Sequence, residues 1–219
     1  MAAFHPNPDD LPAEIPVFPL EGALLLPRAQ LPLNIFEPRY LAMTEDALAA
    51  GRMFGMIQPD PALPATQTGP ALYRIGCLGR LSAFAETEDG RFLITLTGVI
   101  RFQVAEEIDM HREYRRVRPD YSTFYPDLNL TPRPLGLDRQ VLIAALRGYF
   151  HQHGLKADWE AIGKIADDKL VTTLALSCPF RSAEKQALLE SPTDSNRAQT
   201  LFALLQIGAA GDMTVHRPS

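Results

Sequence analysis

The chain has 219 residues, of which 46% are hydrophobic and 21% are charged, values typical of a globular protein with a substantial core. The formal net charge of -5 argues against a nucleic-acid-binding protein that depends on phosphate contacts, although it does not exclude a local basic patch. The amino terminus lacks the pattern of a secretory signal, and no apolar run reaches the roughly 20 residues that cross a bilayer. We therefore expect a cytoplasmic protein without a membrane partner.

The first part of the chain predicts short strands around one helix. Residues 1–13 are rich in proline and acid and are expected to form a flexible leader. A strand is expected over residues 15–20, and its two prolines predict a sheet edge, where not every backbone N–H is needed. A second strand ends at Phe36 and leads into a helix that stops near Gly51. FGMIQP then indicates a buried strand before a loop over residues 60–70.

The junction between the second strand and the helix has an unusual order of charges. Pro38 suits the first helical turn, and it restricts Glu37 to an extended conformation near the positive helix end. Arg39 opposes the helix dipole, so we expect Glu37, Glu21 or backbone carbonyls to hold it. Glu37, Pro38, Arg39 and Tyr40 are interpreted as a structural clamp, and direct contact with a ligand is the alternative.

The clearest secondary structure is a hairpin with an Asp-Gly turn at residues 89–90. Apolar residues occupy every second position over 92–104, which predicts a long strand with one buried face, and residues 73–85 form the other arm. Gly98 falls on the apolar side, as expected of a bulge that curls a sheet into a barrel. One more strand is expected over residues 114–118.

Beyond the prolines around residue 130 the apolar period becomes helical and predicts five helices. The sequence therefore predicts an α+β fold in which a curled β-barrel precedes a small helical bundle. The expected divisions are a flexible leader (1–13), a β-barrel domain (14–122), a linker (123–135), a helical bundle (136–207) and a frayed tail (208–219).

Three parts of the sequence carry a family resemblance. They are PVFPLEGALLLPRAQLPLNIFEPRYLAM followed by FGMIQP, then RIGCLGRLSAFAETEDGRFLITLTGVIRF, then the helical segments SAEKQALLES and NRAQTLFALL. From about Ile15 to Leu205, the chain resembles the amino-terminal, substrate-binding domain of the ATP-dependent protease Lon in its free-standing bacterial form. The resemblance implies a barrel of the pseudouridine-synthase-and-archaeosine-transglycosylase type (PUA-like) followed by helices.

Catalytic signatures are absent from the sequence. It has no GxxxxGKS/T phosphate loop, no GxSxG elbow and no HExxH pair. Full Lon proteases carry an ATPase module and a serine–lysine peptidase module, so the resemblance transfers neither activity, and we expect no enzyme, cofactor or metal. His151 and His153 stand two apart at a helix end, which favours capping over a shared metal. Cys77 and Cys178 lie in apolar sequence and are expected to be buried, reduced thiols.

A basic cluster surrounds the last predicted strand. Arg116 and Arg118 should share one side of it, and Arg115 should lie on the other, by strand alternation. We take Tyr114, Arg116 and Arg118 as candidates for contact with an acidic peptide or an RNA backbone. The alternative is a solvated edge strand whose charges discourage edge-to-edge pairing.

The functional prediction is a non-catalytic protein-binding module that recognises extended segments by strand addition and apolar pockets. The resemblance implies recognition of unfolded or client proteins, or a regulatory link to a Lon-type protease. The alternative is a barrel that binds RNA or a small molecule, and the acidic balance weighs against RNA. An unrecognised hydrolase is disfavoured because no nucleophile, base and orienting residue can be assembled. The sequence makes no prediction of the oligomeric state.

Overall fold

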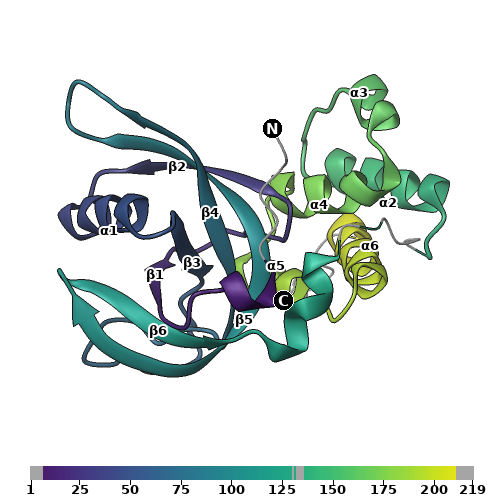
Figure 1. Ribbon diagram of the computed structural model, residues 1–219. Coiled ribbons are helices and arrows are strands. Elements are labelled where there is room, and N and C mark those ends of the chain that lie inside the picture. The colour runs from purple at the N-terminus through teal and green to yellow at the C-terminus, as the bar shows by residue number, and fades with distance from the viewer. Residues whose placement is uncertain (1–6, 130, 132–135, 211–219) are drawn as a thin grey trace, which may run out of the picture. The chain divides into compact units, whose positions relative to one another are not determined.

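The computed structural model describes residues 7–129, 131 and 136–210, and the chain divides into two compact units at residues 130 and 131 (Figure 1). The first unit is a curled sheet with one α-helix, and the second is helical, which confirms the predicted α+β class. The division into domains given above stays a prediction, with one structural observation on its linker. Residues that were assigned to it form the 3-10 helix η2 (Ser122–Leu128), whose Phe124 is buried in the core of the first unit.

The sheet of the first unit contains six strands within the described residues. They are β1 (Ile15–Pro19), β2 (Gln30–Ile35), β3 (Met53–Ile57), β4 (Ile75–Glu86), β5 (Phe92–His111) and β6 (Tyr114–Asp120). Their order is β2-β5-β4-β3-β1-β6, and a further pairing joins β5 to β6. The last five strands in this order therefore close into a ring, and β2 lies outside the ring against the first part of β5.

The hairpin of β4 and β5 has the predicted Asp-Gly turn and the predicted bulge. Gly79 pairs with Gly98, whereas Leu78 pairs with Ile100, so β5 carries one extra residue there. A Cβ atom at Gly98 would stand 2.0 Å from the carbonyl oxygen of Leu26, so this backbone approach requires glycine. The predicted long strand is confirmed, and the bulge gives it the curvature that closes the ring.

The prediction that β1 lies at a sheet edge is wrong, because β1 pairs with β3 on one side and with β6 on the other. The pairing with β3 begins at Val17, and the pairing with β6 ends at Val17. The Leu20 N–H donates to the Ile57 carbonyl at 3.0 Å, so strand alternation directs position 16 towards β3 and position 19 towards β6. Pro16 therefore precedes the β3 pairing and Pro19 follows the β6 pairing, and neither removes a ladder hydrogen bond.

A core of buried apolar side chains fills the ring of strands. Its members are Ile15, Val17, Ile57, Leu78, Ile100, Phe102, Val117, Tyr121 and Phe124. Leu11 packs against this core, and the 3-10 turn η1 (Pro8–Asp10) precedes it, so the expected leader is structured in its second half. Residues 1–6 lie outside the described part of the chain.

Helix α1 (Pro38–Ala49) follows β2 directly, and Figure 1 shows it between the β4–β5 and β5–β6 hairpins. It buries Tyr40, Met43, Thr44 and Ala47. Gly51 follows the helix with φ of +89°, the left-handed conformation that glycine adopts without strain, as predicted for its C-terminal end.

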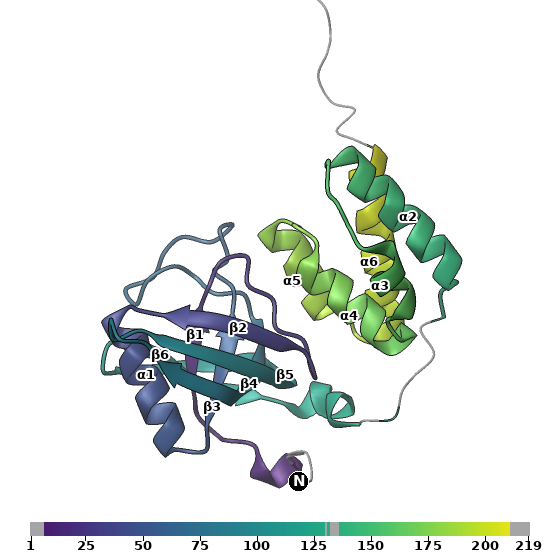
Figure 2. The same cartoon turned by 90° about the horizontal axis from the view of Figure 1, so that it is seen from above.

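The second unit contains five α-helices within the described residues. They are α2 (Arg139–Gln152), α3 (Trp159–Lys164), α4 (Asp167–Ser177), α5 (Ser182–Glu190) and α6 (Asp194–Ala210). Helices α2 and α6 lie side by side (Figures 1 and 2), and the Tyr149 ring packs where a side chain on Gly208 would clash. Because α6 runs to Ala210, the expected frayed tail begins as helix, and residues 211–219 lie outside the described part.

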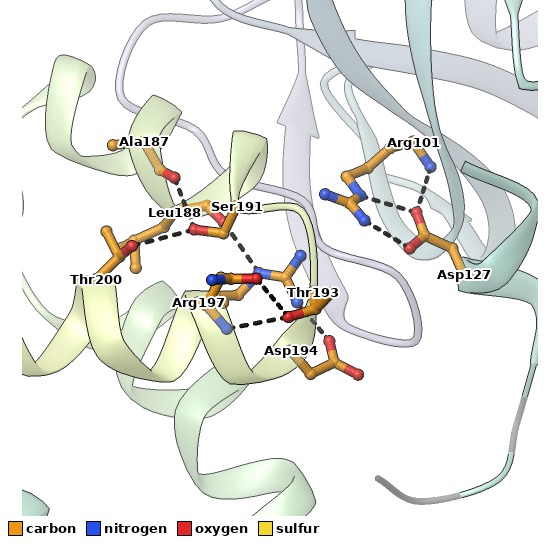
Figure 3. Close-up of polar contacts among 10 residues, drawn as sticks. Arg101, Asp127, Ala187, Leu188, Ser191, Thr193, Asp194, Arg197 and Thr200 are labelled. Carbon is orange, nitrogen blue, oxygen red and sulfur yellow. Dashed lines mark hydrogen bonds and ion pairs between the residues drawn. The ribbon is translucent and has the colours of Figure 1, made fainter. Parts of the chain in front are cut away.

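The turn between α5 and α6 is held by polar contacts (Figure 3). Arg197 is buried, donates to the Leu188 carbonyl at 2.9 Å and pairs with Asp194 at 2.6 Å. The Thr193 hydroxyl accepts the Asn196 N–H at 3.1 Å, which caps the start of α6. These contacts fix where one helix ends and the next begins.

Candidate functional site

The predicted clamp residues lie at the start of α1, as expected. Glu37 is extended (φ -72°, ψ 133°), and Pro38 occupies the first helical position. Arg39 donates two hydrogen bonds to Glu37, at 2.8 and 3.1 Å, and its guanidinium lies 4.6 Å from the ring centroid of Tyr40. Tyr40 is buried against Phe18, with ring centroids 4.1 Å apart.

Solvent exposure distinguishes Tyr40, which is buried, from the ion pair of Arg39 and Glu37, which is exposed. The side chains of Arg39 and Glu37 are 44% and 45% exposed, so their ion pair is screened and contributes about 0 to 1 kcal/mol. Tyr40 is 4% exposed and fixes the helix to β1 through Phe18. The clamp interpretation and the ligand alternative both stay predictions, and burial assigns the anchoring to Tyr40.

Tyr114, a predicted binding residue, is buried and points into the protein. Its hydroxyl donates to Asp46 of α1 at 2.8 Å. Burial is the larger cause and this hydrogen bond the smaller cause that together raise the pKa of Tyr114 to about 12. Arg112, in the turn between β5 and β6, pairs with Asp46 at 2.8 Å and with Glu45 at 3.0 Å. These contacts tie the β5–β6 hairpin to α1.

Arg116 and Arg118 share one side of β6, as predicted, and glutamates face them. Arg116 contacts Glu14 at 2.5 Å, and Arg118 contacts Glu14 at 3.2 Å and Glu106 at 2.5 Å. An acidic ligand would have to displace these two glutamates to reach the guanidinium groups. Their role in binding stays a prediction.

Two ion pairs that involve a buried arginine escaped the sequence reasoning (Figure 3 shows the second). Arg115, on the opposite side of β6, donates to both oxygens of Glu107 at 2.7 Å. Arg101 makes a two-point contact with Asp127 of η2 at 2.8 Å, and Asp127 also accepts the backbone N–H of Arg101. Arg101 occupies an apolar-strand segment, and a charged residue within such a segment is the signal that could have indicated a buried partner.

An exposed apolar surface lies where β2, β5 and β4 run side by side. Asn34 pairs with Leu93, and Leu93 pairs with Ala85, so these residues form one row across the three strands. Leu93 is 48% exposed and Phe36, just after β2, is 61% exposed. The Arg91 guanidinium lies 5.9 Å from the Phe36 ring, which places Phe36 on the same face as Leu93.

We name the set of Phe36, Ala85 and Leu93 the outer apolar patch. Exposed large apolar side chains that gather at one place mark interaction surfaces more often than scattered ones do. The sequence reasoning placed Phe36 at the apolar end of a strand and did not single out Leu93. Leu93 is apolar between the buried positions of an alternating strand, and that mismatch was the available signal.

No group of three or more histidine, cysteine or acidic residues that could hold a metal occurs among residues 7–129, 131 and 136–210. Cys77 and Cys178 are free and buried, as predicted, and burial raises the pKa of Cys178 to about 12. No helix in the described part of the chain combines the length and apolar character that crossing a bilayer requires.

The elements and their pairing define an α+β protein in which a curled β-barrel precedes a helical bundle in the sequence. Residues 14–206 match the family described as the ATP-dependent protease La (LON) substrate-binding domain, and the chain belongs to this family. The resemblance to the Lon substrate-binding domain is therefore confirmed. The match concerns the substrate-binding domain and not the catalytic domain of Lon.

Relatives found among known proteins are named Lon protease. The chain is 20% identical to the Lon protease of Elusimicrobium minutum over 209 residues, which are 91% of this chain and 24% of that protein. It is 23% identical to the Lon protease of Flavobacterium johnsoniae over 121 residues, 52% of this chain and 15% of that protein. The chain thus spans a quarter or less of the length of these relatives.

Two solved structures share the fold. A Lon N-terminal domain protein from Xanthomonas campestris superposes with a TM-score of 0.56 at 22% identity, covering 87% of this chain and 97% of that one. The N-terminal domain of the Mycobacterium avium complex Lon protease gives the same TM-score at 13% identity, covering 91% of this chain and all of that one. At such identities the likeness concerns the fold.

Proposed function

We propose that the chain is a non-catalytic protein-binding module that recognises unfolded or client polypeptides in the cytoplasm, for delivery to a Lon-type protease or for regulation of one. The observation that carries the proposal is the match of residues 14–206 to a substrate-binding domain. The relatives that share this region are named Lon protease, and a protease acts on proteins.

The outer apolar patch supports this proposal, because an unfolded polypeptide differs from a folded one chiefly in its exposed apolar side chains. Phe36 and Leu93 provide a surface for such side chains, with Arg91 beside the aromatic ring. The arginines of β6 support nucleic acid less well, since Glu14 and Glu106 already face them.

The test measures binding to reduced and carbamidomethylated lysozyme, a polypeptide that cannot refold, by fluorescence anisotropy. Leu93→Asp places a charge in the patch and is expected to weaken binding about tenfold or more. Met110→Asp is the matched control, because Met110 is also on β5 and also 48% exposed, and it should bind as the wild type does. Equal affinities of the two variants would remove the patch from the proposal.

The partner is tested separately, with the tagged chain as bait in a native lysate. Recovery of a Lon-type protease or of client proteins, unchanged by ribonuclease, is the expected result. Recovery that ribonuclease abolishes would favour RNA binding by the barrel. Arg116→Ala and Arg118→Ala test the candidates on β6: weaker client binding would support a binding role, and unchanged binding would remove them from the site.

A further inference from the structure

The free side of β2 has a defined hydrogen-bonding pattern. Within the described residues β2 pairs with β5 and with no other strand. The Gly98 N–H donates to the Ala29 carbonyl at 2.9 Å, and the register continues from Gln30 opposite Thr97. By strand alternation the backbone groups of residues 31, 33 and 35 face β5, and those of residues 30, 32 and 34 face away.

Proline occupies the middle of this outward-facing series. Gln30, Pro32 and Asn34 are exposed, whereas Leu31 and Leu33 are half-buried. Because Pro32 has no N–H, the outer side of β2 offers two donors, Gln30 and Asn34, and the three carbonyl acceptors. Proline at an edge also limits indiscriminate pairing with other sheets. The outer edge of β2 therefore lacks one N–H donor but can still form backbone hydrogen bonds with an added strand.

The surroundings of this edge fit an apolar, uncharged segment. The outer apolar patch adjoins its carboxyl end, and Asn34 shares a row with Leu93. Two arginines that lie close in sequence to patch residues are paired with acids, since Arg39 contacts Glu37 and Arg91 contacts Asp89, both at 2.8 Å. A charged segment would gain little from such compensated pairs, whereas apolar side chains at alternate positions would bury the patch.

We propose that β2 binds one extended, apolar segment of an unfolded polypeptide as an added strand. The segment accepts hydrogen bonds from the N–H groups of Gln30 and Asn34, donates to the carbonyl of Pro32, and lays alternate side chains on the outer apolar patch. This inference rests on the proposed function and adds the mode of binding: recognition of the backbone at one defined edge.

The experiment compares three variants for binding to reduced and carbamidomethylated lysozyme. Asn34→Pro deletes an outward N–H, and Asn34→Ala keeps it while removing the same side chain. One lost hydrogen bond predicts affinity about 3- to 10-fold weaker for Asn34→Pro than for Asn34→Ala. Pro32→Ala restores the missing donor and is expected to tighten binding about 2- to 5-fold. Circular dichroism checks that each variant is folded.

Equal affinities of Asn34→Pro and Asn34→Ala, together with unchanged affinity of Pro32→Ala, would overturn strand addition. If Leu93→Asp still weakens binding in that case, the proposed function stands and only the mode is wrong. Absence of binding by the wild type would overturn the proposed function together with the mode. If Asn34→Pro fails to fold, Pro32→Ala decides, because the gain needs only a folded protein with a new N–H on the edge.

Discussion

The contact between Arg101 and Asp127 holds η2 against the barrel and permits a quantitative prediction. The two side chains are 4% and 10% exposed, so water screens their interaction very little. Asp127 accepts two side-chain hydrogen bonds and one backbone hydrogen bond from Arg101, and the Arg101 guanidinium lies 4.8 Å from the Phe124 ring centroid. Arg101 therefore joins β5 to η2 at two points, the Asp127 carboxylate and the Phe124 ring.

Asp127→Ala removes the carboxylate and leaves a buried guanidinium opposite it. Breaking a buried pair in this way costs roughly 3 to 5 kcal/mol, which lowers the melting temperature by roughly 10 to 20 °C in a unit of this size. The unfolding free energy is measured by chemical denaturation, with circular dichroism following the sheet. Asp109→Ala, at an exposed position of β5, is the control and should change stability by less than about 0.5 kcal/mol.

A double-mutant cycle tests the reasoning directly. In an Arg101→Met background the charge is gone, so Asp127→Ala should then cost about 1 kcal/mol or less. A loss below about 1 kcal/mol in the wild-type background would contradict the assignment of η2 as part of the barrel unit. An equal loss in both backgrounds would mean that Asp127 acts without Arg101.

Three further outcomes follow from the structure. Gly98→Ala would place Cβ against the Leu26 carbonyl and should cost about 3 kcal/mol or more in chemical denaturation, whereas Gly163→Ala, in open space on α3, should gain roughly 0.5 to 1 kcal/mol. Arg39→Ala should cost less than about 1 kcal/mol because its ion pair is exposed, and a larger loss would restore it as a clamp. Burial raises the pKa of Glu107, but hydrogen bonds from Arg115 and Thr68 and the charge of Arg115 together outweigh it and lower the pKa below the ordinary value of 4.5. The contribution of Glu107 to stability is therefore present above pH 4.5 and is lost as the pH falls through the folded value. Glu107→Gln should therefore unfold with a shallower dependence on pH below 4.5, and an unchanged profile would show that Glu107 does not contribute.

The hairpin and the junction before α1 show how far local sequence patterns reach. Alternation of apolar residues predicted β5, and an Asp-Gly pair predicted its turn. Pro38 and Gly51 predicted the ends of α1. Each of these signals acts over a few residues, where steric limits on the backbone and the period of the side chains leave one arrangement.

The sheet edge shows where such patterns fail. Prolines in β1 predicted an edge, but β1 is paired on both sides, and the open edge is β2, which contains a single proline. The missing donors in β1 fall just outside each pairing, and this depends on the register between strands that are distant in the sequence. The prolines in a sequence show which backbone N–H groups are missing. The register between strands decides whether a neighbouring strand would have needed those groups.

The sequence by itself determined the order of strands and helices, the turn and bulge of the main hairpin, and the family resemblance. Only the tertiary structure decided which charges are available at the surface. Glu14 meets Arg116 across 102 positions, and Asp127 meets Arg101 across 26. Ring closure brings these residues together, because the pairing of strands that are distant in the sequence sets which side chains meet. The same closure leaves the free side of β2 and the outer apolar patch exposed next to each other.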